Sequence, residues 1–93
     1  MKVSFTYDFF YLLNEQVRFI SKDKTIAAIK FKKDLISNLK KDLKFPFNFK
    51  KSIYFEDELI RDYVFKGYTI VYKINVSSNR VEIFEFIKYM ESL

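Results

Sequence analysis

The most informative segment of the chain reads Leu59-Ile60-Arg61-Asp62-Tyr63-Val64-Phe65-Lys66-Gly67-Tyr68-Thr69-Ile70-Val71-Tyr72-Lys73-Ile74. It places the only glycine, Gly67, between two runs that are rich in β-branched and aromatic residues. Such residues favour strands, and glycine supplies the backbone conformation that a tight turn between two strands requires. The segment therefore predicts a β-hairpin, with strands over about 59–65 and 68–76.

The first third of the chain predicts one strand and one helix. Val3, Phe5 and Tyr7 alternate with polar residues, which is the period of a half-buried strand. Asp8 is a suitable N-cap for a helix that runs to about Ser21. The apolar residues that recur on one face of this helix are Phe10, Leu13, Val17 and Ile20.

A polar turn over residues 21–25 leads to a second helix, which we expect to fold back antiparallel to the first. Its apolar stripe consists of Ala28, Ile29, Phe31, Leu35, Ile36, Leu39 and Leu43. Pro46 ends helical geometry, because the residue before a proline is pushed toward extended conformations. Phe45, Phe47 and Phe49 then predict an extended connector, which we expect to close as a lid over the helical hairpin. An exposed docking patch is the alternative.

The last strand is expected over residues 80–87, after the turn-forming sequence Ser77-Ser78-Asn79. The order of elements is then β-α-α-β-β-β, with the first strand joining the edge or interior of a three-stranded meander. The fold class is α+β: two layers, with the helical hairpin packed on an antiparallel sheet. A chain of 93 residues buries about one core, so a single domain over residues 1–93 is expected.

Composition excludes several classes of chemistry. The chain has no cysteine and no histidine, which removes disulfides, thiolate nucleophiles, imidazole bases and the usual zinc sites. We expect no metal and no cofactor. No apolar run approaches the roughly 18 residues of a membrane helix, and no secretory signal is evident, so no membrane partner and a cytoplasmic location are expected.

Positive charge is concentrated in the middle of the chain. Residues 22–51 contain ten lysines and three aspartates, a net charge of +7, whereas the whole chain carries +5. Such a segment attracts phosphates or an acidic protein. Because it contains no glycine-rich cradle and no arginine cluster, a solvated helix face is favoured over a nucleic-acid site.

The pattern of Arg61 followed by Gly67-Tyr68-Thr69-Ile70-Val71-Tyr72, set behind a helix-rich first half, resembles the RelE/ParE superfamily of bacterial toxins. These are the toxin components of type II toxin–antitoxin modules. Residues 26–31 look like the small-residue start of the family's second helix, and residues 44–46 like the proline-containing exit from it. The resemblance covers nearly the whole chain and implies a RelE/ParE-like fold.

The superfamily divides by target. RelE-like members cut messenger RNA on the ribosome and need converging basic groups around the reacting phosphate, whereas ParE-like members poison DNA gyrase. Thr69 stands where cutting members carry an arginine, and Ile60 and Asp62 stand where they carry lysines. The resemblance therefore implies a ParE-like toxin, which inhibits growth by binding its target, with DNA gyrase expected, and which a cognate antitoxin neutralises.

Two alternatives stay open. One is a RelE-like, metal-independent and ribosome-dependent mRNA endoribonuclease, with catalytic candidates Arg61, Arg80, Lys88 and Tyr89. The other is a decayed, non-toxic homologue that still binds antitoxin.

An antitoxin is the partner common to all three readings. Lysines on the second helix suit an acidic antitoxin segment and would accelerate the encounter, while aromatic residues supply apolar contact. The antitoxin-binding candidates are Lys30, Lys33, Lys40, Lys41, Phe45, Phe47 and Phe49.

Overall fold

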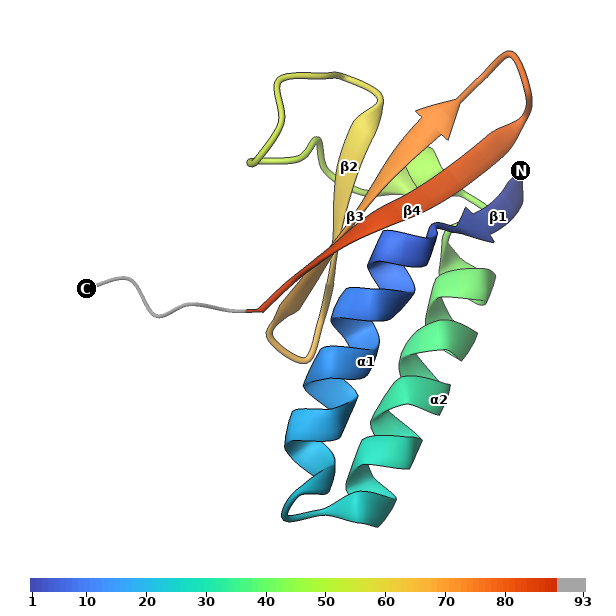
Figure 1. The fold of residues 1–93 in the computed structure, drawn as a ribbon. Coiled ribbons are helices and arrows are strands. Elements are labelled where there is room, and N and C mark those ends of the chain that lie inside the picture. Colours follow the sequence, from blue (N-terminus) through green and yellow to red (C-terminus); the bar gives the residue numbers. More distant parts are fainter. Residues whose placement is uncertain (89–93) are drawn as a thin grey trace.

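The computed structural model describes residues 1–88, which form two helices packed on a four-stranded sheet (Figure 1). The α+β class and the order β-α-α-β-β-β are confirmed. The elements are β1 (Lys2–Phe5), α1 (Tyr7–Ser21), α2 (Thr25–Asp42), the short 3-10 helix η1 (Pro46–Asn48), β2 (Ile60–Phe65), β3 (Tyr68–Asn75) and β4 (Arg80–Ile87).

The sheet is mixed, with the strand order β1-β4-β3-β2. The pairs β2–β3 and β3–β4 are antiparallel as predicted, but β1 runs parallel to β4, so the prediction of a wholly antiparallel sheet is wrong. The cause is the route of the chain. Both helices cross one face between β1 and β2, and such a crossover allows the two outer segments of the chain to meet in parallel.

The hairpin predicted from the glycine is confirmed. Lys66 and Gly67 both have positive φ, at 49° and 86°, which is the requirement of the two-residue turn that matches the twist of paired strands. Phe65 pairs with Tyr68 directly beside this turn. The turn at Lys66 and Gly67 therefore sets the register of β2 against β3.

The start of α1 differs from the prediction. Thr6, not Asp8, is the N-cap, and its hydroxyl oxygen accepts a hydrogen bond of 3.1 Å from the backbone N–H of Phe9. Tyr7 is the first helical residue and is 82% exposed, so it is not an inward-facing strand residue. Threonine is also one of the residues that favour the N-cap position, so the helix can begin at Tyr7, and β1 is short.

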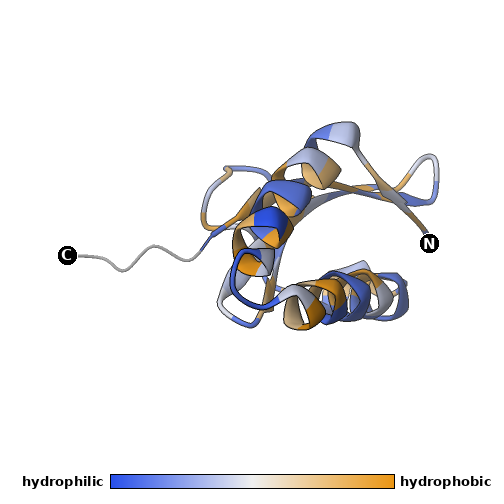
Figure 2. Ribbon diagram, turned by 60° about the horizontal axis from the view of Figure 1, so that its bottom comes forward, coloured by the Kyte–Doolittle hydropathy of each residue, from blue (hydrophilic) through white to orange (hydrophobic). Residues whose placement is uncertain are grey.

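One core lies between the helices and the sheet. Of the predicted stripe of α2, Ala28, Phe31, Leu35 and Leu39 are buried, whereas Ile29 is 63% exposed. Figure 2 shows a hydrophilic turn between two helices that both carry hydrophobic residues. The buried aromatic and aliphatic residues that complete the core are Phe9, Leu13, Leu43, Tyr63, Ile70, Tyr72, Ile74, Val81, Ile83 and Phe86.

A β-bulge in β4 maintains this core across an irregular register. Ile83 pairs with Tyr72 and Glu85 with Val71, so Phe84 is the extra residue between them. Both Ile83 and Phe86 are buried although they are three positions apart, because the extra residue changes the alternation. Phe84 instead contacts Phe55, with ring centres 5.5 Å apart.

Candidate binding surface

Arg61, one of the four catalytic candidates of the alternative nuclease hypothesis, is bonded to the protein's own backbone. Its Nε donates to the carbonyl of Glu58 at 2.9 Å, and its Nη1 donates to the carbonyl of Phe49 at 2.8 Å. The guanidinium carbon lies 5.4 Å from the centre of the Phe47 ring. Arg61 therefore ties the segment that precedes β2 to the sheet.

The other catalytic candidates do not gather around Arg61. Arg80 begins β4 and Lys88 directly follows it, so an extended strand separates them by roughly 26 Å. Arg80 neighbours the buried Val81, and alternation places Arg80 on the face away from the core. Tyr89 lies outside the described residues. Among residues 1–88, the structure therefore brings no two of the candidate cations together.

The three phenylalanines of the connector do not form the predicted extended lid. Residues 46–48 form a 3-10 helix with proline at its first position, where the fixed φ of proline is favourable. Phe45 is 66% exposed and Phe47 50% exposed, so the lid prediction is wrong for both. Phe49 is half-buried and packs on Tyr63, with ring centres 5.1 Å apart. We call residues 45–49 the aromatic step.

Two tyrosines of the sheet hold the aromatic step and the end of α2. The Tyr72 hydroxyl donates to the carbonyl of Pro46 at 2.6 Å, and the Tyr63 hydroxyl donates to the carboxylate of Asp42 at 2.6 Å. Burial raises the pKa of both phenols above the ordinary value, and for Tyr63 the Asp42 carboxylate adds to the effect. Both phenols therefore stay protonated at neutral pH and position the step without acting as bases.

The candidate lysines lie on the solvent side of α2. Lys30, Lys33, Lys40 and Lys41 are all exposed. Lys30 pairs with Asp34 at 2.8 Å, and this hydrogen bond lowers the pKa of the Asp34 carboxyl. Lys40 and Lys41 lie in the last turn of α2, a few residues before the aromatic step. The structure thus places cations and exposed aromatic rings at one end of the helical hairpin.

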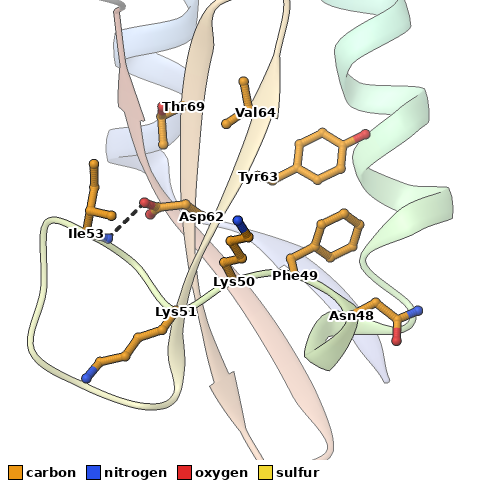
Figure 3. Close-up of a pocket in the computed structure, with 9 residues that line it drawn as sticks. All are labelled: Asn48, Phe49, Lys50, Lys51, Ile53, Asp62, Tyr63, Val64 and Thr69. Carbon is orange, nitrogen blue, oxygen red and sulfur yellow. Dashed lines mark hydrogen bonds between the residues drawn. The ribbon is translucent and has the colours of Figure 1, made fainter.

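A cleft of about 530 Å³ lies beside the aromatic step, between residues 48–53 and β2 (Figure 3). One carboxylate oxygen of Asp62 accepts the backbone N–H of Ile53 at 3.0 Å, and its other oxygen is buried without a partner among the described residues. Lys50 and Lys51 also line the cleft, together with mostly apolar side chains. Its lining offers apolar contact and charged groups of both signs.

No three acidic side chains in residues 1–88 are grouped so that they could hold a metal ion. In the same range, neither helix is long and apolar enough to cross a membrane. No family model matches the chain, and a comparison with curated proteins finds no similar sequence. The RelE/ParE resemblance stays a prediction that rests on the quoted motifs and the order of elements.

Sequence patterns missed one further surface, along the second half of β4. The prediction extended the first strand to Tyr7, which would have covered more of β4 than the four-residue β1 does. A threonine at position 6, which can cap a helix, was the one sequence feature that could have predicted the shorter first strand. The bulge at Phe84 had none, because its alternation of apolar residues depends on the pairing with β3.

Proposed function

We propose that this protein is the toxin of a type II toxin–antitoxin module, nearer the ParE than the RelE branch, and that it inhibits growth by binding its target. DNA gyrase is the proposed target, and a cognate antitoxin is the proposed neutralising partner. The order of elements, with a helical hairpin on one face of the sheet, is the arrangement that the resemblance predicts. It supports the proposal without identifying the target.

The distribution of the cations carries the choice of binding over cleavage. Transfer of a ribose hydroxyl to a phosphate requires fixed positive charge and a proton acceptor at one point. Here Arg61 is bonded to two carbonyls, while Arg80 and Lys88 lie at opposite ends of one strand. This distribution of the candidate cations favours binding over cleavage.

The aromatic step is the proposed contact surface. Phe45 and Phe47 are exposed, yet the backbone beneath them is held by the Tyr72 and Arg61 hydrogen bonds. Exposed aromatic rings on a fixed backbone lose little conformational entropy when they bind. The lysines at the end of α2 would speed association with an acidic partner.

Expression without antitoxin tests the toxin assignment. We expect growth arrest with the native chain and restored growth with the double variant Phe45→Ala, Phe47→Ala. Tyr7→Ala is the matched control, because Tyr7 is also an exposed aromatic residue but lies at the start of α1; this variant should still arrest growth. Normal growth with the native chain would contradict toxicity and favour the decayed homologue.

A supercoiling assay with purified gyrase and plasmid tests the target. Inhibition that is lost in the double variant supports the gyrase assignment. Unchanged supercoiling at saturating protein would remove gyrase as the target. If growth still stops and primer extension shows cleaved messages on stalled ribosomes, the RelE-like nuclease is correct instead.

A further inference from the structure

The second half of β4 is an unpaired sheet edge. β1 pairs only with residues 80–83 of β4. The pairing ends where the N–H of Thr6 donates to the carbonyl of Ile83 at 2.9 Å. The chain then turns into α1, and within residues 1–88 no other strand pairs with residues 84–88 on that side. Figure 1 shows β1 beside only the first half of β4. Unpaired strand edges are templates for another extended chain.

A groove runs along this open edge, between β4 and α1. It consists of two hollows of about 360 Å³ and about 270 Å³, and Leu12 lines both of them. The wall on α1 is formed by Asp8, Leu12, Glu15 and Phe19, whose spacings of four and three place them on one helix face. The groove thus lies beside β4 where β1 would lie if it were longer, and its central part is apolar.

A side chain occupies the position that a partner strand would take. The N–H of Phe86 donates to the carboxylate of its neighbour Glu85 at 3.1 Å. A carboxylate oxygen here replaces the carbonyl oxygen of an adjacent strand. Such a local bond keeps the edge satisfied in the free protein and is released by rotation of one half-buried side chain.

Charge differs between the two ends of the groove. Asp8 and Glu85 lie at the end near β1. At the other end, Lys88 and Lys22 extend over the Phe19 ring, with their Nζ atoms 4.9 Å and 6.0 Å from its centre. Glu15 at this end is paired with Arg18 at 2.6 Å, so its charge is compensated. The groove is acidic at one end and basic at the other.

From these contacts we infer that the open edge of β4 binds an extended peptide segment of another protein. The segment carries a cationic side chain at the Asp8–Glu85 end, alternating apolar side chains over Leu12 and Phe19, and a carboxylate at the Lys88 end. Five residues of strand span roughly 16 Å, the length of residues 84–88. The peptide cation attracts Glu85 away from Phe86, and a peptide carbonyl then accepts the Phe86 N–H.

This site goes beyond the proposed function, which uses the aromatic step, and it does not rest on that function. The probe is the acetylated and amidated peptide Glu-Val-Thr-Val-Thr-Val-Lys, titrated into isotope-labelled protein and followed by NMR. We expect the largest amide shift at Phe86, with smaller shifts at its neighbours on β4. Peptides with lysine at both ends or glutamate at both ends should bind about threefold more weakly. A version that is N-methylated at its central valine should not bind.

Two variants separate the groove from the rest of the surface. Phe19→Ala removes an exposed groove wall and should weaken binding about fivefold. Val64→Ala is the matched control, because Val64 is also exposed but lies on β2, and this variant should bind as the native protein does. Shifts confined to the lysines of α2, equal binding of the N-methylated peptide, or no shift at millimolar peptide would each overturn the inference. Concentration-dependent dimerisation through residues 84–88 would do the same, since the occupant would be a second copy.

Discussion

The two sides of the sheet end in different ways. On the β2 side, the segment before the strand returns and covers it: the N–H of Asp62 donates to the carbonyl of Lys50 at 3.1 Å, and the N–H of Ser52 donates to the carbonyl of Ile60 at 2.8 Å. On the β4 side, no strand or loop of the described residues pairs with the outer edge of the second half of β4, and the Phe86 N–H bonds to the adjacent Glu85.

The difference lies in how far apart in sequence the bonded groups are. Arg61 and Asp62 on β2 bond to residues up to twelve positions away, so these bonds order a long loop. The bond between Glu85 and Phe86 joins neighbours and orders almost nothing else. The β2 side is therefore built for stability, whereas the β4 side can be opened at little cost.

The largest effect is expected from Arg61→Ala. The substitution removes two hydrogen bonds from a charged donor and leaves the carbonyls of Glu58 and Phe49 without that partner. We expect the free energy of unfolding to fall by about 3 kcal/mol, measured by urea denaturation. Arg80→Ala is the matched control, because Arg80 is exposed, and it should change stability by less than about 0.5 kcal/mol. Equal effects of the two substitutions would refute the special role of the β2 side.

Alkaline pH should weaken the attachment of the aromatic step next. The folded-state pKa of Tyr63 and of Tyr72 is raised above the unfolded value of about 10, so their contribution is complete below pH 10 and is lost as pH rises above it. Two such phenols should cost about 2 kcal/mol of stability between pH 10 and pH 11. Urea denaturation at the two pH values measures this loss.

The control for the pH effect is the double variant Tyr63→Phe, Tyr72→Phe. It should be less stable at pH 8, because Pro46 and Asp42 lose their donors, but its stability should decline less between pH 10 and pH 11. Tyr7→Phe, at an exposed position, should retain the native pH dependence. A decline of the same size in the double variant would assign the effect to other groups, such as the lysines.

A smaller effect is expected from Asp62→Ala. This substitution removes the acceptor of the Ile53 N–H, but it also removes a buried carboxylate oxygen that has no partner among the described residues, and the two changes partly offset each other. We expect a loss of about 1 kcal/mol and faster hydrogen exchange at the Ile53 amide. Asp62→Asn retains an acceptor oxygen and should protect that amide as the native residue does. Unchanged exchange in the alanine variant would contradict the role of Asp62 in holding the loop.

Sequence predicted those parts of the fold that depend on local patterns. Gly67 fixed the hairpin, and the period of Phe31, Leu35 and Leu39 fixed the buried face of α2. The parallel pairing of β1 with β4 was not predicted, because it depends on the path of the whole chain. The conformation of the aromatic step was not predicted either. Alternation in the sequence indicates an extended segment, but Pro46 favours a tight turn, and the Tyr72 hydroxyl then holds this turn.

The candidate site was less predictable than the fold. Arg61 was identified as a functional cation, yet its guanidinium is occupied by carbonyls that no sequence pattern places nearby. The separation of Arg80 from Lys88 could have been predicted, since Arg80 begins the predicted strand over 80–87 and Lys88 directly follows it. To predict the groove beside β4, one would need to know at the same time where β1 ends, where the bulge lies and how α1 packs.

The smallest effect on stability, and the sharpest test of the comparison, is Glu85→Ala. Because the Phe86 N–H lies at a sheet edge that water can reach once the carboxylate is gone, we expect a loss of less than about 0.5 kcal/mol. Hydrogen exchange at the Phe86 amide should nevertheless become faster, while exchange at the Ile53 amide on the opposite side stays unchanged. Glu85→Gln keeps an acceptor oxygen and should slow the exchange again. If Glu85→Ala instead destabilised the protein as much as Asp62→Ala, the carboxylate would be part of the framework, and the second half of β4 would not be an edge held ready for a partner.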